Sequence, residues 1–597
     1  MTLPDELRRA ALAWMADDPD PETRAELERL LESGDAPALA DRFAGSLQFG
    51  TAGLRGLLGA GPNRMNRKVV LRATAGLCAY LLETTPGAAE RGVCIGFDGR
   101  RLSRELASDA AEVVCGMGLR VHAFESVVPT PVLAFACLET KAAAGIMVTA
   151  SHNPPDYNGY KVYWENGAQI IPPHDEGIAA AIARVGAVPE IPRASFAEAA
   201  RGGRATILGA ATERRYLDGV RALAVHPELP RDVSIAYTAL HGVGDRLATT
   251  ALAEAGFASV ASVAEQAEPD GRFPTVAFPN PEEKGAMDMV LALAKEKSAD
   301  LVLANDPDAD RLAVAVRDRA GGYVQLTGNE VGCLLGHYLL DQGAQGGSRV
   351  VINTIVSSPM LGSIARAHGA SWEQTLTGFK WIANRALARG REGARFVLGY
   401  EEALGYTVGA LVRDKDGIGA AVVVADMAAW CKSRGRTLLD ELEAAWRRLR
   451  DVPQPADQQG PAGDRGRTAD RRHDGEGARR SRARARRPSG AVRARSRGGG
   501  APERRRGAAV RAPEGRRDRP RARGRPPRDA PPERHGAQDQ ALRGRARGRA
   551  RGRAHRGRAR ARRGRHGRAR RRARGDHEAL ALSRCSRRPC AWRRRRA

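Results

Sequence analysis

One segment of the sequence places a serine in a setting that suits nucleophilic chemistry. An apolar run at residues 145–148 leads into Thr-Ala-Ser-His-Asn-Pro-Pro, so Ser151 and His152 fall in a turn-rich loop, with Lys161 shortly after it. A hydroxyl held on a rigid turn beside a histidine and a lysine can attack an electrophile or carry a phosphoryl group. Asn and Pro also form turns in any protein, so a plain turn is the alternative.

A second loop contains three carboxylates at alternate positions. Residues 305–311 read Asn-Asp-Pro-Asp-Ala-Asp-Arg, with Asp306, Asp308 and Asp310 followed at once by Arg311. The three side chains converge on one point if the loop wraps, and hard oxygen ligands in that number suit Mg²⁺. The alternative is a solvated acidic loop, which does not explain why the adjoining segments are so apolar.

Two further segments carry weaker signals. Residues 399–406 place Glu401 and Glu402 beside tyrosines in a loop bounded by glycines, and carboxylates in such a place can accept hydrogen bonds from sugar hydroxyls. Lys415 follows in Arg-Asp-Lys-Asp-Gly and can serve as a charge or a proton donor. Residues 51–56 form a glycine-rich turn in which the fork of Arg55 can face a phosphate.

The elements around these loops alternate between strands and helices. After a helical lead-in that ends near Phe43, this alternation predicts α/β units with mostly parallel sheets, whose ligands bind beyond the carboxyl ends of the strands. We expect strands at residues 92–97, 119–124, 144–149, 233–238, 301–305 and 396–399, and helices at 103–116, 244–255 and 328–342.

The basic charge of the chain is confined to one end. The 597 residues include 97 Lys and Arg against 69 Asp and Glu, but 49 of the basic residues, all Arg, and 14 of the acidic ones lie from Asp451 onward. The first 450 residues therefore hold 48 basic and 55 acidic groups, and are slightly acidic. The Arg-rich end has no Phe, Tyr, Ile or Met, so we expect it to be disordered.

Membrane and secreted proteins are excluded as classes by the sequence pattern. It contains no run of 18 apolar residues, and residues 1–22 are acidic and amphipathic, unlike a secretory signal. Six of the eight cysteines are scattered singly through apolar segments without metal-ligand spacing, as buried thiols of a cytoplasmic protein would be.

Together these motifs resemble the α-D-phosphohexomutase superfamily, the phosphoglucomutases and phosphomannomutases. The matching pieces run in family order from about residue 40 to 445 and are TAGLRG, GFDGR, TASHNP, LHGVG, DPDADR, TLTGFKW, GYEEALGY and RDKDG. The long N-terminal lead and the GFK and EEALGY loops look most like the phosphoglucomutase-2/phosphopentomutase branch.

The resemblance implies a fold of three consecutive α/β domains with mixed or parallel sheets. The expected units are a helical lead-in at residues 1–40 and domains at 41–205, 206–325 and 326–446, which carry the phosphoserine, metal and sugar loops in that order. Residues 447–597 form the Arg-rich low-complexity segment, which takes the place of the family's fourth domain.

The resemblance also implies a reaction. Ser151 would carry a phosphoryl group and pass it to a hexose 1- or 6-phosphate, with glucose as the expected sugar and a hexose 1,6-bisphosphate as the intermediate. One Mg²⁺ would bind Ser151, Asp306, Asp308 and Asp310 and neutralise charge on the transferring group. The expected partner is a small sugar phosphate; no membrane partner is expected, and nucleic acid only if the Arg-rich segment is a real product.

The remaining site residues follow from the same resemblance. The catalytic set is Ser151, His152, Lys161, Lys415 and Arg55, with Lys415 favoured over His152 as general acid or base; the substrate-binding set is Gly378, Phe379, Lys380, Glu401, Glu402, Arg413 and Arg311. The family often has Ser two residues after its sugar-binding Glu, where this chain has Ala403. One sugar hydrogen bond is therefore missing, and pentose or mannose phosphate stays open as the substrate.

The Arg-rich end has two interpretations. The family's fourth domain contains a phosphate-binding loop, R-P-S-G-T-E-P-K, and synonymous codons for residues 531–540 allow this loop when read one nucleotide out of frame. We hypothesise that the true frame is lost near residues 445–450, which predicts weakened substrate affinity for the literal chain. The rival is a disordered arm that binds nucleic acid, although aromatic residues for stacking are almost absent. A non-catalytic sugar-phosphate binder is a third possibility.

Overall fold

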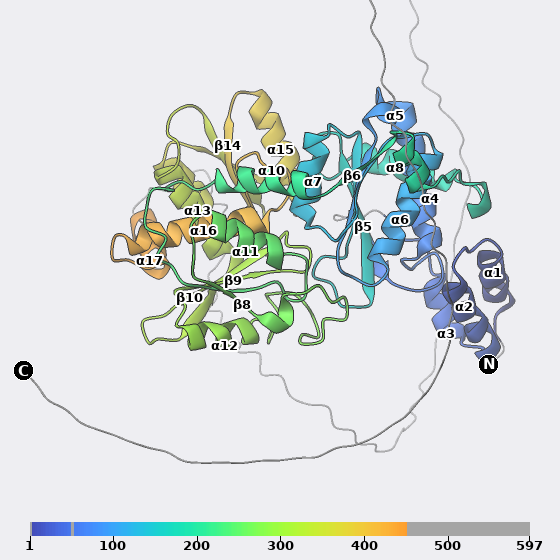
Figure 1. Cartoon of the computed structure of the whole chain (residues 1–597), viewed down its shortest axis with the longest axis horizontal. Coiled ribbons are helices and arrows are strands. Elements are labelled where there is room, and N and C mark those ends of the chain that lie inside the picture. Colours follow the sequence, from blue (N-terminus) through green and yellow to red (C-terminus); the bar gives the residue numbers. More distant parts are fainter. Residues whose placement is uncertain (1–2, 49–52, 451–597) are drawn as a thin grey trace, which may run out of the picture. The chain divides into compact units, whose positions relative to one another are not determined.

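The computed structural model describes residues 3–48 and 53–450 of the chain. In this part, three N-terminal helices lead into three α/β units, each built on its own sheet (Figure 1). The predicted fold class of three consecutive α/β domains with mixed sheets is confirmed. The expectations for residues 451–597 lie outside the described residues, and the predicted domain boundaries stay a prediction.

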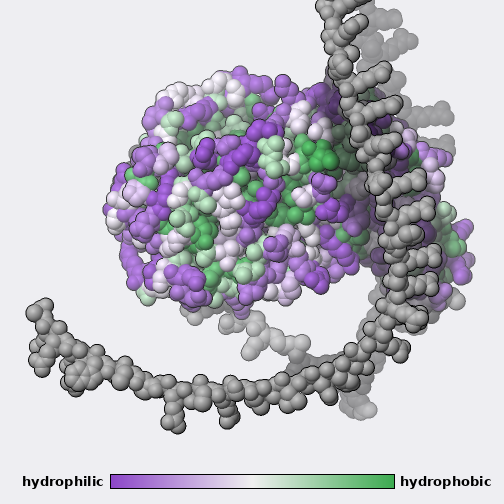
Figure 2. Space-filling view, in the orientation of Figure 1, coloured by the Kyte–Doolittle hydropathy of each residue, from purple (hydrophilic) through white to green (hydrophobic). Residues whose placement is uncertain are grey.

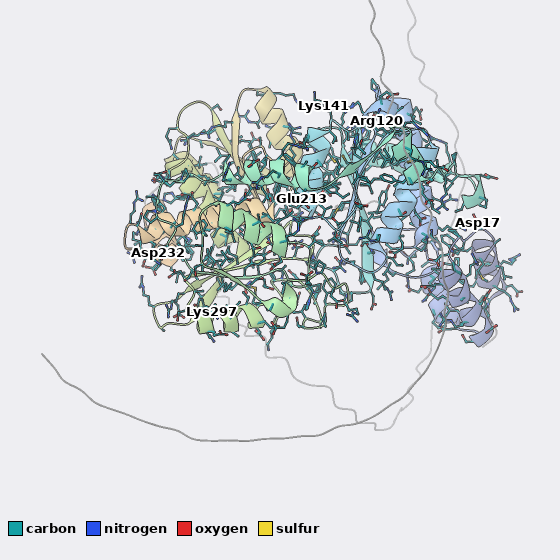
Figure 3. All side chains as sticks on the ribbon, viewed as in Figure 1. Asp17, Arg120, Lys141, Glu213, Asp232 and Lys297 are labelled. Atoms are coloured by element: carbon teal, nitrogen blue, oxygen red, sulfur yellow. The ribbon has the colours of Figure 1, made fainter. Side chains whose placement is uncertain are left out.

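The N-terminal lead-in consists of three short helices, as predicted: α1 (Asp5–Met15), α2 (Pro21–Ser33) and α3 (Ala36–Arg42). Asp20 and Asp35 precede α2 and α3 and accept hydrogen bonds from N–H groups that the first helical turn leaves unpaired. Asp17, labelled in Figure 3, joins the helices to the next unit, because it pairs with Lys68 and accepts a 3.1 Å hydrogen bond from the backbone N of Val188.

The first unit has a six-stranded sheet in the order β1-β5-β4-β2-β3-β6. Its centre is parallel, and β1 and β5 add antiparallel strands at one edge. The strands are β1 (Leu54–Leu57), β2 (Val93–Phe97), β3 (Val121–Phe124), β4 (Ala144–Val148), β5 (Tyr157–Trp164) and β6 (Ala205–Leu208). The helices are α4 (Arg67–Thr84), α5 (Ala88–Arg91), α6 (Ser103–Gly116), α7 (Thr130–Glu139), α8 (His174–Ala183) and α9 (Phe196–Arg201), with the 3₁₀ turn η1 (Val188–Glu190).

The second unit has a five-stranded sheet in the order β11-β10-β9-β7-β8. Strands β7, β8 and β9 are parallel, and β10 and β11 continue the sheet as an antiparallel meander. The strands are β7 (Ile235–Thr238), β8 (Val260–Ser262), β9 (Leu301–Asn305), β10 (Leu312–Arg317) and β11 (Tyr323–Leu326). The helices are α10 (Ala210–Arg221), α11 (Asp245–Glu254) and α12 (Asp288–Lys297), with the 3₁₀ turn η2 (Ala264–Gln266).

The third unit has a four-stranded sheet in the order β13-β12-β14-β15, of which only β15 is antiparallel. The strands are β12 (Arg349–Thr354), β13 (Ser371–Thr375), β14 (Arg395–Glu401) and β15 (Gly405–Val408). The helices are α13 (Gly328–Asp341), α14 (Met360–Ala367), α15 (Phe379–Arg391), α16 (Gly417–Lys432) and α17 (Leu438–Arg450). All the strands and helices predicted from periodicity are present, with ends shifted by at most two residues.

Apolar packing joins the units. Helix α16 is buried along nearly its whole length, because it packs against α10, α11 and β9 of the second unit and β15 of the third. The apolar core around it continues without a break to the α7 side of the first sheet. The predicted buried thiols are confirmed for the described part of the chain, where the cysteines are free and buried: Cys78, Cys94, Cys115, Cys137, Cys333 and Cys431.

The surface of the described part mixes hydrophilic and hydrophobic side chains (Figure 2). On the face shown in Figure 2, hydrophilic side chains cover most of the area and hydrophobic ones form patches between them. Among residues 3–48 and 53–450, no helix combines the length and the apolar character needed to span a bilayer.

Candidate active site

The serine loop and the acidic loop meet. Ser151 follows β4 of the first unit and Asp306 follows β9 of the second, both at the carboxyl ends of parallel strands, where α/β folds place their ligands. The Oγ of Ser151 donates a 2.7 Å hydrogen bond to Oδ2 of Asp306, and both residues are buried. A hydroxyl and a carboxylate that are 155 residues apart in sequence thus form the centre of the site.

The three aspartates of the acidic loop converge, as their spacing predicted. Each of Asp306, Asp308 and Asp310 offers a carboxylate oxygen, and these oxygens lie within 4.8 Å of one another. All three residues are completely buried. Thr130, at the start of α7, donates a 2.7 Å hydrogen bond to Oδ2 of Asp308 and thereby fixes one carboxylate from the first unit.

The donor set fits a divalent cation. One oxygen of Asp308 and one of Asp310, Oδ1 in each, are buried and accept no hydrogen bond from the described residues. Burial and the neighbouring carboxylates raise the pKa of Asp306 well above its usual range, because three ionised carboxylates in so small a buried space repel one another. Buried carboxylate oxygens without partners, gathered at one point, are the ligands that Mg²⁺ prefers.

Two buried lysines neutralise part of this charge. Nζ of Lys161 donates to Oδ2 of Asp308 at 2.7 Å and to Oδ2 of Asp310 at 2.8 Å, and Nζ of Lys415 lies 3.1 Å from the same Asp310 oxygen. Burial lowers the pKa of Lys415, but the carboxylates of Asp310, Asp414 and Glu401 outweigh it and raise that pKa. Lys415 is therefore protonated at neutral pH and can donate a proton.

Two arginines at the site keep unpaired donors. The Nε groups of Arg55 and Arg311 are buried and donate to none of the described residues, although NH1 of Arg55 donates to Oδ1 of Asn153 at 3.0 Å. A buried guanidinium with a free N–H is suited to bind a phosphate. Arg55 lies in strand β1, which pairs with β5, so the expectation of a turn is wrong for residues 54–56, while the phosphate-facing role of Arg55 stays a prediction. An arginine on a strand is held more rigidly than one in a turn.

His152 lies beside the serine hydroxyl. Its Nδ1 is 3.2 Å from Oγ of Ser151. Burial, followed by the positive charges of Arg311 and Arg55, lowers the pKa of His152 to about 2. The imidazole is therefore neutral, and its lowered pKa makes it a weak proton acceptor.

The two glutamates of the third loop differ in their contacts. Glu401 accepts a 2.7 Å hydrogen bond from the backbone N of Gly378, the residue before α15, and burial raises the pKa of Glu401. Oε2 of Glu402 instead accepts hydrogen bonds from the hydroxyls of Thr354 and Ser357. Glu401 is thus held toward Lys415 and the acidic loop. One oxygen of the Glu402 carboxylate is instead hydrogen-bonded to residues of the third unit.

The other predicted substrate-binding residues lie in the same part of the third unit. Phe379 and Lys380 open α15, and Nζ of Lys415 lies 5.7 Å from the centre of the Phe379 ring. Arg413 donates a 2.7 Å hydrogen bond to the carbonyl of Asn166 in the first unit. No ligand contact distinguishes these residues, and their roles stay predictions.

Each of the three loops contains a non-glycine residue in the left-handed backbone region. The φ angles are 54° at Ser151, 56° at Ala309 and 61° at Leu404. This conformation is unfavourable for residues with a side chain and persists only where the surrounding contacts enforce it. In each of the three loops, the surrounding contacts therefore have to enforce this conformation.

Two glycines let the acidic loop approach its neighbours. A Cβ on Gly242 would lie 2.3 Å from Cα of Pro307, and a Cβ on Gly417 would lie 2.3 Å from the carbonyl oxygen of Arg311. Both contacts are with backbone, which cannot move without displacing the aspartates between Pro307 and Arg311. Gly242 belongs to the LHGVG segment and Gly417 to RDKDG, which explains why both segments need glycine.

Gly417→Ala is therefore expected to destabilise the protein by about 2 kcal/mol and to weaken divalent-cation binding, because overpacking displaces the acidic loop. Urea unfolding and Mg²⁺ titration measure the two effects. Gly390→Ala is the matched control: Gly390 lies within α15 with open space around it, so the change is expected to be neutral or slightly stabilising. Unaltered Mg²⁺ binding by the Gly417 variant would contradict the proposed close contact.

Several residues of the site carried no role in the sequence interpretation. Thr130 anchors Asp308, and Asp414 accepts 2.7 Å hydrogen bonds from the side chains of Tyr163 and Gln169 while it lies beside Lys415. The polar residues of GFDGR contact the serine loop. Asp414 and the GFDGR residues had a signal in the sequence, since RDKDG and GFDGR were recognisable as motifs, but neither motif indicated what these residues touch.

Comparison with known proteins agrees with this geometry. Residues 46–188, 214–321 and 327–449 match the family models of phosphoglucomutase/phosphomannomutase alpha/beta/alpha domains I, II and III. A phosphopentomutase of Mus musculus is 37% identical over 453 residues, which cover 72% of each chain. A probable phosphomannomutase of Haemophilus influenzae is 44% identical over 382 residues, 63% of this chain and 74% of that protein.

A solved structure shows the same fold. The crystal structure of a putative phosphomannomutase from Thermus thermophilus aligns with 68% of this chain and 84% of its own, with a TM-score of 0.56 and 25% sequence identity. Sequence and fold therefore agree over the three described α/β units.

Proposed function

Because the chain belongs to the phosphoglucomutase/phosphomannomutase family of the α-D-phosphohexomutase superfamily, whose members are phosphosugar mutases, we propose a specific reaction for it. It interconverts hexose 1-phosphate and hexose 6-phosphate, with glucose as the sugar, through a phosphoserine at Ser151 and a hexose 1,6-bisphosphate. The observation that carries this proposal is the 2.7 Å contact of the buried Ser151 hydroxyl with Asp306, in a carboxylate cluster that fits a cation.

The proposed cycle begins with the phosphoserine. The bond between Oγ of Ser151 and phosphorus breaks, a new bond forms between phosphorus and the free hydroxyl oxygen of the sugar phosphate, and the hydroxyl proton passes to a base. The bisphosphate then turns over in the site. Its other phosphoryl group returns to Oγ of Ser151, and the sugar oxygen that leaves takes a proton. The serine is phosphorylated again and the phosphate has changed position on the sugar.

Two residues of the chain suit the proton transfers. Lys415, whose pKa is raised, can protonate the leaving sugar oxygen and, once deprotonated, can accept the hydroxyl proton in the reverse direction. His152, whose Nδ1 lies 3.2 Å from Oγ of Ser151, is the second candidate, and its lowered pKa makes it the weaker base of the two. Both residues act on oxygens and not on phosphorus.

The site offers groups that can balance the negative charge of the phosphoryl group during its transfer. Asp306, Asp308, Asp310 and the serine oxygen would hold Mg²⁺, which when bound neutralises negative charge on the phosphoryl group. Arg55 and Arg311 contribute their unpaired Nε donors to the same phosphate. We also expect the reaction to take place in the cytoplasm, in keeping with the buried free thiols.

The identity of the sugar is tested directly. The purified full-length chain, primed with glucose 1,6-bisphosphate, is assayed with glucose, mannose and ribose 1-phosphates, and kcat/KM is compared. The proposal predicts the highest value for glucose 1-phosphate. Preference for ribose 1-phosphate would establish the second candidate, a phosphopentomutase, which is favoured by the name of the Mus musculus relative. No turnover of any of the three would contradict the proposed reaction.

Glu401→Gln is expected to lower kcat/KM about 10- to 100-fold, because a charged acceptor for sugar hydroxyls contributes about 1.5–3 kcal/mol. Its backbone contact with Gly378 survives, since a glutamine carbonyl accepts the same hydrogen bond. Glu392→Gln, at the exposed end of α15, is the control and should leave the kinetics unchanged. Wild-type kinetics for Glu401→Gln would remove this residue from the sugar-binding set.

A further inference from the structure

The loop after β2 contains a buried ion pair that the proposed reaction does not use. Asp98 and Arg100 belong to GFDGR and are 2% and 4% exposed. Nε of Arg100 lies 3.5 Å from Oδ2 of Asp98. Burying two charges is costly unless further hydrogen bonds satisfy them. The hydrogen-bond partners of Asp98 and Arg100 therefore indicate the role of the pair.

Arg100 donates to the backbone of the serine loop at four points. Its NH2 group donates to the carbonyls of Ser151 at 2.6 Å and Asn153 at 2.5 Å. Its NH1 group donates to the carbonyls of Pro154 at 2.9 Å and Tyr157 at 3.3 Å. One planar guanidinium thus holds the loop from Ser151 to the start of β5.

Asp98 fixes the backbone N–H of Ser151 through the hydroxyl of Thr149. Its Oδ2 accepts a 2.6 Å hydrogen bond from Oγ1 of Thr149, and that Oγ1 accepts a 2.8 Å hydrogen bond from the backbone N–H of Ser151. Its Oδ1 accepts from the hydroxyl of Ser103 and the backbone N of Arg100. The backbone N–H and C=O of Ser151 are therefore both fixed, one through Thr149 and the other by Arg100.

We propose, on the basis of the function proposed above, that Asp98 and Arg100 are positioning residues that hold Ser151 in its left-handed conformation and so aim its hydroxyl at the metal loop. Ser151 has φ 54°, which a serine does not adopt without enforcement. Fixing both of its backbone polar groups supplies that enforcement. The pair acts through the serine and touches neither the hydroxyl nor the aspartates.

The same guanidinium contacts the unit that carries the aspartates. Phe273 of the second unit lies with its ring centre 4.9 Å from Cζ of Arg100, and a Cβ on Gly271 would come within 2.8 Å of Cα of Arg100. Arg100 is therefore packed between the serine loop and the second unit, which carries the acidic loop. A change at Arg100 is expected to disturb the distance between Ser151 and Asp306.

Arg100→Lys is the main test. A lysine has a single ammonium group and cannot span four carbonyls in the way that a planar fork does. The rate at which glucose 1,6-bisphosphate phosphorylates Ser151, followed by mass spectrometry of the full-length chain, is expected to fall roughly 100-fold, the typical effect of misplacing a reacting group by about 1 Å. KM for glucose 1-phosphate is expected to change less than threefold, since Arg100 does not face the sugar.

Arg231→Lys is the matched control. The side chain of Arg231 is 9% exposed, pairs with the buried Asp426 at 2.6 Å, lies 5.0 Å from the ring centre of Phe257, and donates to the backbone carbonyl of His226. None of these residues belongs to the site. Both lysine variants should unfold at similarly lowered temperatures, but only Arg100→Lys should slow the phosphorylation of Ser151.

Thr149→Val tests the other side of the pair. It removes the hydroxyl between Asp98 and the N–H of Ser151 with little change of volume. It is expected to slow phosphorylation as Arg100→Lys does, and the double variant should lose less than the product of the two single losses, because both act on the conformation of one residue. When Thr149→Val is instead combined with Arg231→Lys, the effects of the two changes on the phosphorylation rate should multiply.

The outcomes separate this proposal from the proposed function. If the wild-type chain takes no phosphate on Ser151, the proposed function fails and the positioning role fails with it. A second outcome is that the wild type is phosphorylated and that Arg100→Lys is slowed no more than Arg231→Lys, once each rate is corrected for the fraction of folded protein. In that case the proposed reaction stands and the positioning role is overturned. Independent effects of Arg100→Lys and Thr149→Val would also overturn it.

Discussion

Ser151→Ala is expected to reduce mutase turnover by roughly 10⁴-fold or more, the scale of removing a catalytic nucleophile. The hydroxyl lies 2.7 Å from Asp306 and 3.2 Å from His152, and no other described serine contacts the aspartate cluster. The loss should appear in kcat, because the arginines and Glu401 still bind the sugar phosphate. A coupled assay of glucose 6-phosphate formation measures it.

The control for this variant is Ser363→Ala. Ser363 is also largely buried, lies in α14 of the third unit and accepts a hydrogen bond from Arg366 instead of contacting the site. Its loss should leave turnover within about twofold, since it removes one ordinary hydrogen bond. If Ser151→Ala kept more than about one hundredth of wild-type turnover, a phosphoserine mechanism at this residue would be contradicted.

Asp306→Asn is expected to abolish the stabilisation of the chain by Mg²⁺ and to lower turnover at least roughly 10²-fold. For the wild type, Mg²⁺ at 100 times its Kd should stabilise the fold by about 2.7 kcal/mol. The variant keeps the hydrogen bond from the backbone N–H of Arg311, which its single amide oxygen can accept, whereas its NH2 group takes the place of the oxygen that faces Ser151 and would donate to the hydroxyl oxygen instead. Thermal unfolding with Mg²⁺ and with EDTA measures the difference.

The direction in which Asp306→Asn changes the unfolding temperature without metal follows from the pKa of Asp306. The pKa of Asp306 is raised in the folded state, so the ionised carboxylate destabilises the fold above its unfolded pKa, and this cost disappears as the pH falls. Asp306→Asn should therefore unfold in EDTA at the same temperature as the wild type or at a higher one. Asp232→Asn, an exposed charge change labelled in Figure 3, should leave the response to Mg²⁺ intact. An equal response to Mg²⁺ in Asp306→Asn would exclude this site as the metal site.

The sequence predicts the local elements and the loops well because both depend on short-range patterns. Ser151 and Asp306 were recognisable since each follows an apolar strand and carries residue types with few other uses at that spacing. The rule that ligands lie at the carboxyl ends of parallel strands placed each loop at the edge of its own sheet, whereas the expectation that they meet came only from the family resemblance. The alternation of strands and helices was equally local.

What the sequence could not predict depends on contacts between units. Thr130 looks like an ordinary helix start, and only the packing of the first unit on the second brings its hydroxyl to Asp308. Arg55 was expected in a turn because glycines surround it, yet pairing with β5 makes its segment a strand. The hydrogen bonds of Glu402 to Thr354 and Ser357 likewise depend on how β12 lies beside β14.

The most direct test of the proposed reaction is to identify the phosphoryl acceptor in the full-length chain. The purified protein is incubated with glucose 1,6-bisphosphate and Mg²⁺, digested, and analysed by tandem mass spectrometry. The proposed mechanism predicts a single phosphate per chain, on Ser151, and an isotopic label on that phosphate should pass into the sugar phosphates when excess unlabelled glucose 1-phosphate is added. A phosphate on another residue, or none on a folded chain that turns over sugar phosphates, would contradict it.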